Sequence, residues 1–361
     1  MFFYLAQFKD QISFLNLFRY ITFRTGMAAV TTFLMCLVFG PYLINKLKRM
    51  NIGENTKRED CPVLDQFNDA KEGTPTMGGI FIVGSILVSV FLWADLSNVY
   101  IRLCAFTCLW LAVLGWADDY VKLLRKPKKG ISKKTKLIWQ IMIGCFIGSY
   151  VYFSPDISTK LAVPFLKHVV IDLGIFYIPF VALIIVGTSN AVNLTDGLDG
   201  LAIGCVLVFT VTLAILCYIT GNINFSEYLL LPFVSGSGEL TVFCAAIIGA
   251  SLGFLWFNCY PASVFMGDVG SLSLGGTVGV IAVIIKKELL IVILGGVFVI
   301  EVGSVILQVI SFKIWNRRIF KVSPLHHHLQ LSGWKESKII IRFWILAIIL
   351  AFITLTTLKI R

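Results

Sequence analysis

Long apolar stretches alternate with short polar segments along almost the whole chain. A helix that crosses a bilayer needs roughly 20 apolar residues, and stretches near this length recur ten times. The predicted spans cover residues 26–45, 76–94, 99–117, 137–153, 175–192, 200–220, 240–257, 269–285, 288–312 and 339–358. The pattern predicts an all-α integral membrane protein with about ten transmembrane helices, and we expect residues 1–361 to form a single polytopic domain.

The ninth predicted span has two unusual features. Lys286 and Lys287 form the only clear break between this span and the one before it. The stretch then runs to 25 residues and contains Gly295 and Gly296. Extra length and adjacent glycines predict that this helix is tilted or bent.

Composition agrees with a membrane protein. Hydrophobic residues make up 57% of the chain, charged residues 14%, and the mean hydropathy is +0.86. These values exclude an ordinary soluble domain of this length. The nine cysteines are scattered without a CxxC pair, so we expect them to pack in the core rather than bind metal.

Basic residues cluster in three loops, those after the first, third and ninth predicted spans. These loops hold 20 of the 31 Lys and Arg residues. Because short cytoplasmic loops carry the excess of positive charge, we expect these loops inside the cell and both termini on the outer, periplasmic face. Arg19 and Arg24 precede the predicted start of the first span and oppose this orientation, and an amphipathic N-terminal helix on the outer surface would accommodate them.

The net charge of +11 is thus concentrated at the cytoplasmic interface. It is a topology signal that also attracts anionic lipid headgroups, and a second role in gathering an anionic, phosphate-bearing substrate is equally consistent with it. The chain lacks a basic stripe interleaved with aromatic residues of the kind that single-strand binders use. We therefore expect no nucleic-acid partner.

Five polar segments follow from the same span pattern and all emerge on the cytoplasmic face. A single composite active site at the membrane surface is the simplest interpretation. The segments are Gly73–Gly79, Asp118–Lys136, Asn190–Asp199, Asn258–Ser271 and Pro324–Trp334.

Aspartates carry most of the candidate chemistry. Asp118 and Asp119 are adjacent at the end of a span, where like charges repel unless a divalent cation or a proton relieves them; a helix-end anchor would explain one of them. Asp196 and Asp199 are three apart, so a helical turn would present both to one side. Asp268 is the single acid of its segment, and capping the following helix is its simplest structural role.

Histidines and hydroxyl groups supply further candidates. Three of the four histidines are consecutive, at 326–328, and three successive imidazoles cannot share one helical face, which disfavours a three-histidine zinc site. Contact with a phosphate, a hydrogen bond to a sugar, or one ligating histidine supported by the other two fits better. The 73–79 segment lacks a P-loop ending, but its small and hydroxyl residues, with Lys71 beside them, suit a phosphate.

Two polar residues lie inside the ninth predicted span. Glu301 and Gln308 are seven apart and therefore share a helical face. An ionisable residue at membrane depth is a functional candidate, and a buried hydrogen bond between helices is an equally good explanation.

Several of these segments together resemble a known family. They are GTPTMGG at 73–79, ADDY at 117–120, NAVNLTDGLDGLA at 190–202, FLWFNCYPASVFMGDVGSL at 254–272 and PLHHHLQLSGW at 324–334. In this order, and spread over about residues 40–345, they resemble the phospho-N-acetylmuramoyl-pentapeptide-transferases, bacterial enzymes that make lipid I. Glu72 departs from the pattern, because a basic or neutral residue is expected before GTPTMGG.

The resemblance implies a ten-span, multi-pass enzyme of the bacterial inner (cytoplasmic) membrane that acts in peptidoglycan synthesis, usually as a homodimer. Such enzymes transfer phospho-MurNAc-pentapeptide from UDP-MurNAc-pentapeptide to undecaprenyl phosphate, forming lipid I and UMP, and they require Mg²⁺. The nucleotide substrate, the lipid phosphate and the bilayer are therefore the implied partners.

The resemblance also implies roles for individual residues. Asp118 matches the proposed base, Asp119 its acidic neighbour, and Asp268 the Mg²⁺ ligand; Asp118 and Asp119 are further candidate ligands. Direct attack by the lipid phosphate and a covalent phospho-enzyme are both compatible with these residues. The implied substrate-binding residues are Lys71, Thr76, Lys122, Lys136, Asn193, Asp196, Asp199, Asn258, Phe265, His326, His327 and His328.

Two other functions are alternatives to this expectation, one a related enzyme and the other a transporter. A related polyprenyl-phosphate GlcNAc-1-phosphate transferase would share the aspartate motifs but lack the histidine segment. A divalent-cation or lipid transporter would place acids near mid-membrane on several spans, whereas Glu301 is almost alone there.

Overall fold

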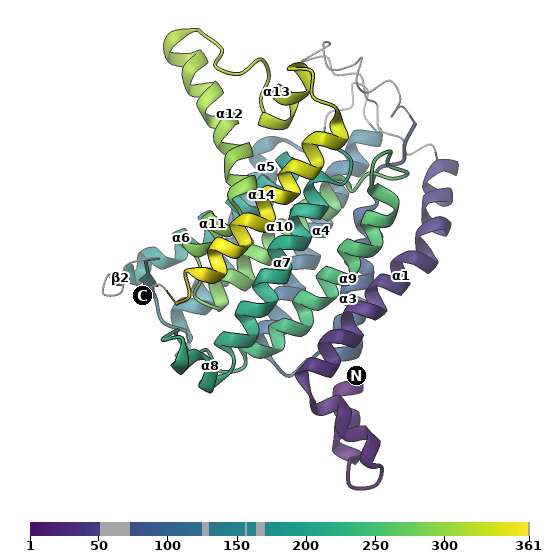
Figure 1. The fold of residues 1–361 in the computed structure, drawn as a ribbon, viewed down its shortest axis with the longest axis vertical. Coiled ribbons are helices and arrows are strands. Elements are labelled where there is room, and N and C mark those ends of the chain that lie inside the picture. The colour runs from purple at the N-terminus through teal and green to yellow at the C-terminus, as the bar shows by residue number, and fades with distance from the viewer. Residues whose placement is uncertain (51–72, 125–129, 156, 164–169, 360–361) are drawn as a thin grey trace.

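The computed structural model describes residues 1–50, 73–124, 130–155, 157–163 and 170–359 (Figure 1). Lys71, Glu72 and most of the basic loops near 57–71 and 125–129 lie outside the described residues. Helices dominate what is described, and the two short strands, β1 Lys160–Ala162 and β2 Val170–Asp172, form one antiparallel pair.

Nine of the described helices are long and apolar enough to cross a membrane, and each lies at a predicted span. They are α1 Ile21–Arg49, α4 Val99–Leu124, α5 Lys133–Phe153, α6 Tyr177–Thr195, α7 Leu201–Thr220, α9 Leu240–Asn258, α10 Gly267–Ile284, α12 Gly296–Trp315 and α14 Glu336–Thr356. The short elements are the 3₁₀ helices η1 Phe2–Phe8, η2 Ser13–Arg19, η5 Gly174–Phe176 and η6 Ser237–Glu239, with α8 Ile223–Tyr228, α11 Leu290–Leu294 and α13 Leu325–Leu331.

The second predicted span, 76–94, appears as the shorter helix α3 Gly79–Trp93, of 15 residues. At 1.5 Å per residue it extends roughly 22 Å, less than the 30 Å apolar layer. The residues around the predicted start of this span are not helical, because their backbone bonds to the segment before α10. Phe265 N–H donates to Pro75 O at 2.8 Å, and Gly78 N–H donates to Phe265 O at 2.9 Å.

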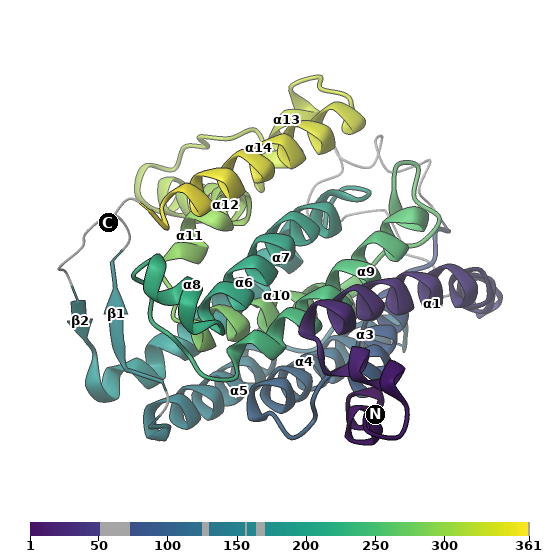
Figure 2. The ribbon, with the colours of Figure 1, turned by 60° about the horizontal axis from the view of Figure 1, so that its bottom comes forward.

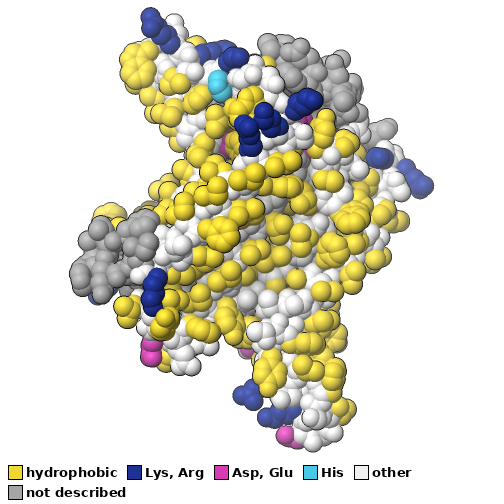
Figure 3. Space-filling model, in the orientation of Figure 1, with side chains coloured by type: hydrophobic (Ala, Val, Ile, Leu, Met, Phe, Trp, Pro, Cys, Tyr) yellow, Lys and Arg dark blue, Asp and Glu magenta, His cyan; other side chains and the backbone are white. Residues whose placement is uncertain are grey.

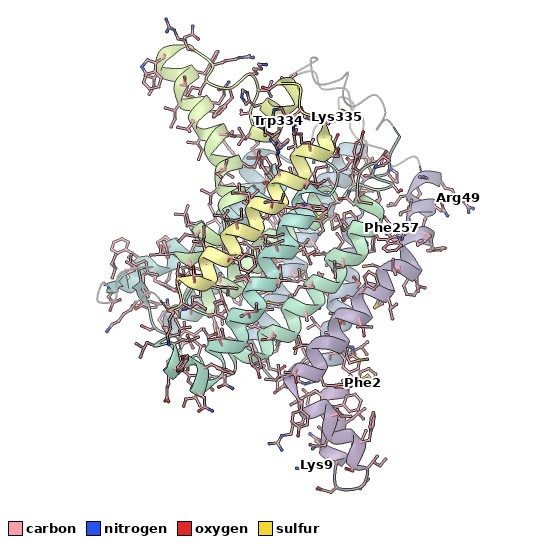
Figure 4. All side chains as sticks on the ribbon, in the orientation of Figure 1. Phe2, Lys9, Arg49, Phe257, Trp334 and Lys335 are labelled. Atoms are coloured by element: carbon pink, nitrogen blue, oxygen red, sulfur yellow. The ribbon has the colours of Figure 1, made fainter. Side chains whose placement is uncertain are left out.

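The long helices alternate in direction. Helices α1, α4, α6, α9 and α12 run toward the end of the bundle that carries α13, and α3, α5, α7, α10 and α14 run back (Figure 1). Both termini therefore lie at the end opposite α13. Figure 4 shows Arg49, Trp334 and Lys335 at the α13 end and Phe2 and Lys9 at the other.

Helix α10 lies at the centre of the bundle and is buried along almost its whole length (Figure 2). It packs mainly against α4 and α6, and also against α3. Glycines allow the close approach: a Cβ on Gly79 would lie 2.1 Å from Gly270 N, and one on Gly276 would lie 2.0 Å from the Leu111 side chain. The central helix therefore fixes the ends of α3, α4 and α6 relative to one another.

The predicted bend in the ninth span is present as a complete break. Helix α11 ends at Leu294, Gly295 adopts a non-helical conformation (φ −87°, ψ 20°), and α12 begins at Gly296. Few residues of α12 are buried, and its far end stands apart from the other helices in Figure 1.

The N-terminal prediction needs correction. Residues 2–19 form two 3₁₀ helices instead of one amphipathic helix, and Arg24 lies inside α1 rather than ahead of the span. The guanidinium of Arg24 is buried and pairs with both carboxylate oxygens of Glu239, one at 2.8 Å. Its charge is therefore neutralised locally, which removes one of the two residues that opposed the predicted orientation.

The surface is typical of a membrane protein. Hydrophobic side chains cover the middle of the face in Figure 3, and Lys and Arg gather near the α13 end and around the N-terminal segment. Large apolar side chains such as Phe39, Phe91, Leu183 and Phe352 are more than half exposed, as expected where lipid replaces water.

Candidate active site

Three aspartates from two helices meet at the α13 end of the bundle. Asp118 and Asp119 lie near the end of α4, and Asp268 lies in the first turn of α10. One carboxylate oxygen from each lies within 4.8 Å of the others. Gly115 makes this possible, because a Cβ there would lie 2.3 Å from Asp268 O. The predicted grouping of these acids on one face is thus present in three dimensions.

Asp119, not Asp268, caps α10. Its Oδ2 accepts hydrogen bonds from the backbone N–H of Asp268 at 2.9 Å and of Val269 at 3.4 Å. The Asp268 side chain makes no cap bond. The structural role suggested for Asp268 is therefore wrong: Asp119 satisfies the free N–H groups of the helix, and the Asp268 carboxylate is left for other contacts.

Two lysines bridge the carboxylates. Lys122 Nζ lies 2.8 Å from Asp118 Oδ2 and 3.0 Å from Asp268 Oδ2. Lys136 Nζ lies 2.7 Å from Asp268 Oδ2 and 3.6 Å from Asp118 Oδ2. The ammonium groups offset the repulsion between the acids, but three carboxylates face two lysines, so the cluster keeps a formal charge of −1.

Lys136 reaches the cluster because of how α5 begins. The Ser132 hydroxyl accepts a hydrogen bond from Thr135 N–H at 3.1 Å and caps the helix. This cap starts α5 so that Lys136 faces the aspartates while Lys133 and Lys134 are exposed. Just before the cap, Ile131 N–H donates to Asp118 Oδ1 at 2.7 Å.

Asn193 completes the cluster from α6. Its Nδ2 donates to Asp268 Oδ1 at 2.6 Å and to Ser271 Oγ at 2.8 Å. Sequence reasoning did not single out Ser271, although its position three residues after Asp268 in a helix places both on one face. Thr76 lies close by, since a Cβ on Gly267 would be 3.2 Å from its hydroxyl.

The aspartate cluster fits a hard divalent cation. Among the described residues, Asp118, Asp119 and Asp268 are the one group of three or more His, Cys, Asp or Glu side chains with ligand atoms close enough to share an ion. All their ligand atoms are carboxylate oxygens, which Mg²⁺ and Ca²⁺ prefer and which zinc sites use less often than His and Cys.

A second group of predicted residues ties two loops together. The Asp199 carboxylate accepts from Ala262 N–H at 2.9 Å. Asn258 Oδ1 accepts from Gly200 N–H at 3.0 Å, and its Nδ2 donates to Val264 O at 2.8 Å. Asp199 and Asn258 are both buried. These bonds hold the segment between α6 and α7 against the segment between α9 and α10, where Phe265 is half-buried.

The expectation that Asp196 and Asp199 share a helical face is wrong. Helix α6 ends at Thr195, and Asp196 has non-helical ψ of 52°. Asp196 is half-buried at the helix end, whereas Asp199 is buried and directed at Ala262. The backbone from Asp196 to Gly200 turns instead of continuing the helix.

The three histidines of α13 contact three different groups. His326 Nδ1 lies 2.9 Å from Glu301 Oε2, and His327 Nδ1 lies 2.8 Å from Gln330 Oε1. His328 Nδ1 accepts from Lys321 N–H at 3.1 Å. The arrangement agrees with the argument against a three-histidine zinc site.

Glu301 and Gln308 have separate roles. Gln308 Oε1 accepts from the backbone N–H groups of Ile319 and Phe320, and its Nε2 donates to Phe320 O. It therefore anchors the loop that follows α12. Glu301 contacts the histidine segment, and His326 in turn lies against Gly197, where a Cβ would be 2.4 Å from its Nε2.

Comparison with known proteins identifies the family. The sequence model of glycosyl transferase family 4 matches residues 101–286, and that of phospho-N-acetylmuramoyl-pentapeptide-transferase signature 1 matches residues 71–83. A phospho-N-acetylmuramoyl-pentapeptide-transferase of Desulforapulum autotrophicum is 51% identical over 362 residues, which cover 100% of both chains.

Other relatives of the same name agree with this result. The protein of a Geobacter species is 51% identical over 346 residues, 96% of each chain. That of Brachyspira hyodysenteriae is 48% identical over 371 residues, again 96% of each chain. The resemblance found in the motifs is confirmed over the full length, and the chain belongs to the phospho-N-acetylmuramoyl-pentapeptide-transferase family.

Proposed function

We infer that this chain transfers phospho-MurNAc-pentapeptide from its UDP carrier to undecaprenyl phosphate, forming lipid I and UMP. The observation that carries the inference is similarity of about half the residues to transferases of that name over the whole chain. The cluster of acids and lysines agrees with it, because moving a phosphoryl group between two anionic substrates needs positive charge to hold them and a carboxylate to accept a proton.

We propose a direct exchange at the aspartate cluster. A lipid phosphate oxygen bonds to the phosphorus that carries the sugar, and the bond from that phosphorus to the UMP oxygen breaks. Asp118 takes the proton of the lipid phosphate, because its carboxylate lies beside the two lysines that would hold that phosphate. Asp119 positions Asp268 by capping α10. Lys122 and Lys136 hold the phosphates in place.

Magnesium is the cation that we propose for this site, held by Asp268 with Asp118 and Asp119 as further ligands. When bound, it would neutralise negative charge on the departing phosphate. Lys122 and Lys136 keep the carboxylates close together before the ion and the substrate arrive.

The remaining predicted residues fall into two groups by position. Asn193 and Thr76 border the cluster and suit phosphate contact, and we propose the same role for Lys71, which lies outside the described residues. Asp196 and Phe265 line the loops between α6 and α7 and between α9 and α10, which we propose bind the uridine part. The other predicted residues shape these loops or contact the substrate from their edges. They are Asp199, Asn258, His326, His327 and His328.

We propose a membrane topology with α3 as the tenth span. The α13 end then faces the cytoplasm, both termini face the periplasm, and the protein resides in the bacterial inner membrane as a single polytopic domain. Undecaprenyl phosphate would approach the site along the apolar outer surface, and we propose a homodimer as the working unit.

The direct test is UMP release by detergent-purified protein supplied with UDP-MurNAc-pentapeptide and undecaprenyl phosphate. We expect release that depends on both the lipid and Mg²⁺. No release from folded protein supplied with lipid would contradict the assignment. Release from UDP-GlcNAc instead would identify the related GlcNAc-1-phosphate transferase activity.

A further inference from the structure

Glu301 lies inside a membrane-spanning helix, and both oxygens of its carboxylate contact one histidine, His326. Its Oε2 lies 2.9 Å from His326 Nδ1, and its Oε1 accepts from the His326 backbone N–H at 3.2 Å. Both residues are wholly buried. The contact joins α12 to α13 across 25 residues of sequence, so a residue at membrane depth sets the position of a residue at the site end.

This contact determines which nitrogen of His326 carries the proton. An ionised carboxylate only accepts hydrogen bonds, so Nδ1 must donate. The neutral ring then presents Nε2 as an acceptor. Nε2 is buried and has no hydrogen-bond partner within the described part of the chain. Burial without a partner is unfavourable, and a ligand that supplies a donor would relieve it.

The unpartnered nitrogen faces the loop between α6 and α7. A Cβ on Gly197 would lie 2.4 Å from His326 Nε2, so glycine is required for the ring to sit there. The Gly197 N–H is already bonded to Thr195 O at 2.8 Å. This loop carries Asp196 and Asp199, and a molecule bound beside it would be placed to supply a donor for Nε2.

We propose that Glu301 is a positioning residue for the nucleotide substrate. It holds the His326 ring so that Nε2 accepts a hydrogen bond from an N–H or O–H group of the uridine nucleotide. The proposal rests on the function inferred above. His327 and His328 do not share this arrangement, because their Nδ1 atoms contact Gln330 and the Lys321 backbone.

The first test compares Glu301→Gln with the wild type in steady-state UMP release. The amide keeps the shape but no longer requires Nδ1 to donate, so the KM for UDP-MurNAc-pentapeptide should rise about tenfold. The KM for undecaprenyl phosphate should stay within about twofold. Ser311→Ala is the matched control, because Ser311 is buried on the same helix and bonds Arg317 O; it should shift neither KM.

A double-mutant cycle separates positioning from a general structural role. If Glu301 acts through His326, then Glu301→Gln should raise the nucleotide KM no further in a His326→Asn background. Additive effects, or a loss of stability with both KM values unchanged, would overturn the proposal. Activity of the wild type in the same assay tests the inferred function separately.

The protonation of the two His326 ring nitrogens can also be measured in the wild-type protein. In protein labelled with ¹⁵N-histidine, one buried ring should show a protonated Nδ1 and an unprotonated Nε2. UDP-MurNAc-pentapeptide should shift that Nε2 resonance, and Glu301→Gln should abolish the shift. An Nε2 resonance that does not respond to the nucleotide in active protein would refute the proposal.

Discussion

Both ends of the helix bundle bury charge, but they balance it differently. At the end that bears the termini, Arg24 pairs with Glu239, and Lys286 pairs with Glu288 under the Tyr177 ring. Each of these ion pairs joins one acid to one base, and all four charged side chains are at most 11% exposed. At the α13 end, three aspartates share two lysines, and the Lys122 side chain is 40% exposed.

The difference separates a structural use of buried charge from a chemical one. In a matched, buried pair each charge already has its counter-charge, and breaking the pair leaves a stranded charge. A cluster with one acid in excess and a lysine open to solvent can exchange partners. We interpret the terminal-end pairs as links between helices and the aspartate cluster as the place where cation and phosphates bind.

The largest effect should come from Asp268→Asn. The amide cannot replace the charge that faces Lys122 and Lys136, so we expect kcat to fall on the order of 10³-fold with the thermal unfolding midpoint nearly unchanged. UMP release and unfolding in the same detergent measure the two quantities. Turnover close to that of the wild type would place the chemistry elsewhere.

Glu239→Gln should show the opposite pattern. The guanidinium of Arg24 would remain buried beside a neutral partner, and breaking such a pair costs about 3 kcal/mol of unfolding free energy. We expect the KM values of the surviving protein to be unchanged. Titration with a denaturing detergent measures the loss, and the double variant Arg24→Met with Glu239→Met should recover much of it. A stability unaffected by Glu239→Gln would remove the distinction between the two ends.

Lys136→Met tests the contribution of one lysine to the aspartate cluster. Removing one of two lysines leaves the aspartates less compensated and the phosphates less firmly held, so we expect kcat/KM to fall roughly 30-fold, about 2 kcal/mol. Lys134 belongs to the same run but is exposed, and Lys134→Met should change kcat/KM by less than about twofold. Equal losses in both variants would indicate a general effect of surface charge.

The smallest effect should come from Tyr177→Phe. The Tyr177 hydroxyl donates to Glu288 Oε1 at 2.5 Å and accepts from Lys286 Nζ at 2.9 Å. Phenylalanine keeps the ring over the lysine and leaves the ion pair intact, so we expect a loss of about 1–2 kcal/mol in unfolding free energy. The same detergent titration detects it, and a drop in kcat without a drop in stability would argue that this end also contributes to the reaction.

The apolar pattern alone predicted most of the architecture. In the part of the chain that the structure describes, nine long helices lie at predicted spans, because in a bilayer the length of an apolar stretch directly reflects a physical thickness. The sequence also predicted a tilt or bend in the ninth span, where the structure has a break at Gly295. The start of α3 was not predicted, because the residues before Gly79 bond to Phe265, and no local pattern reports a partner so distant in sequence.

The site was predictable in its residue types but not in its contacts. Asp118, Asp119 and Asp268 could be grouped because the span pattern placed them on one face. Asp119 caps α10 and Asp268 pairs with the lysines because of how α10 packs against α4. Asp199 and Asn258 were expected to bind the substrate, and their hydrogen bonds to loop backbone depend equally on tertiary structure.

We propose that the excess acid at the α13 end holds a divalent cation. Binding of Mn²⁺, a paramagnetic substitute for Mg²⁺, can be measured by electron paramagnetic resonance with UDP-MurNAc-pentapeptide present. We predict one bound ion in the wild type and in Glu239→Gln, and none in Asp268→Asn. Equal binding by the wild type and Asp268→Asn would contradict the claim.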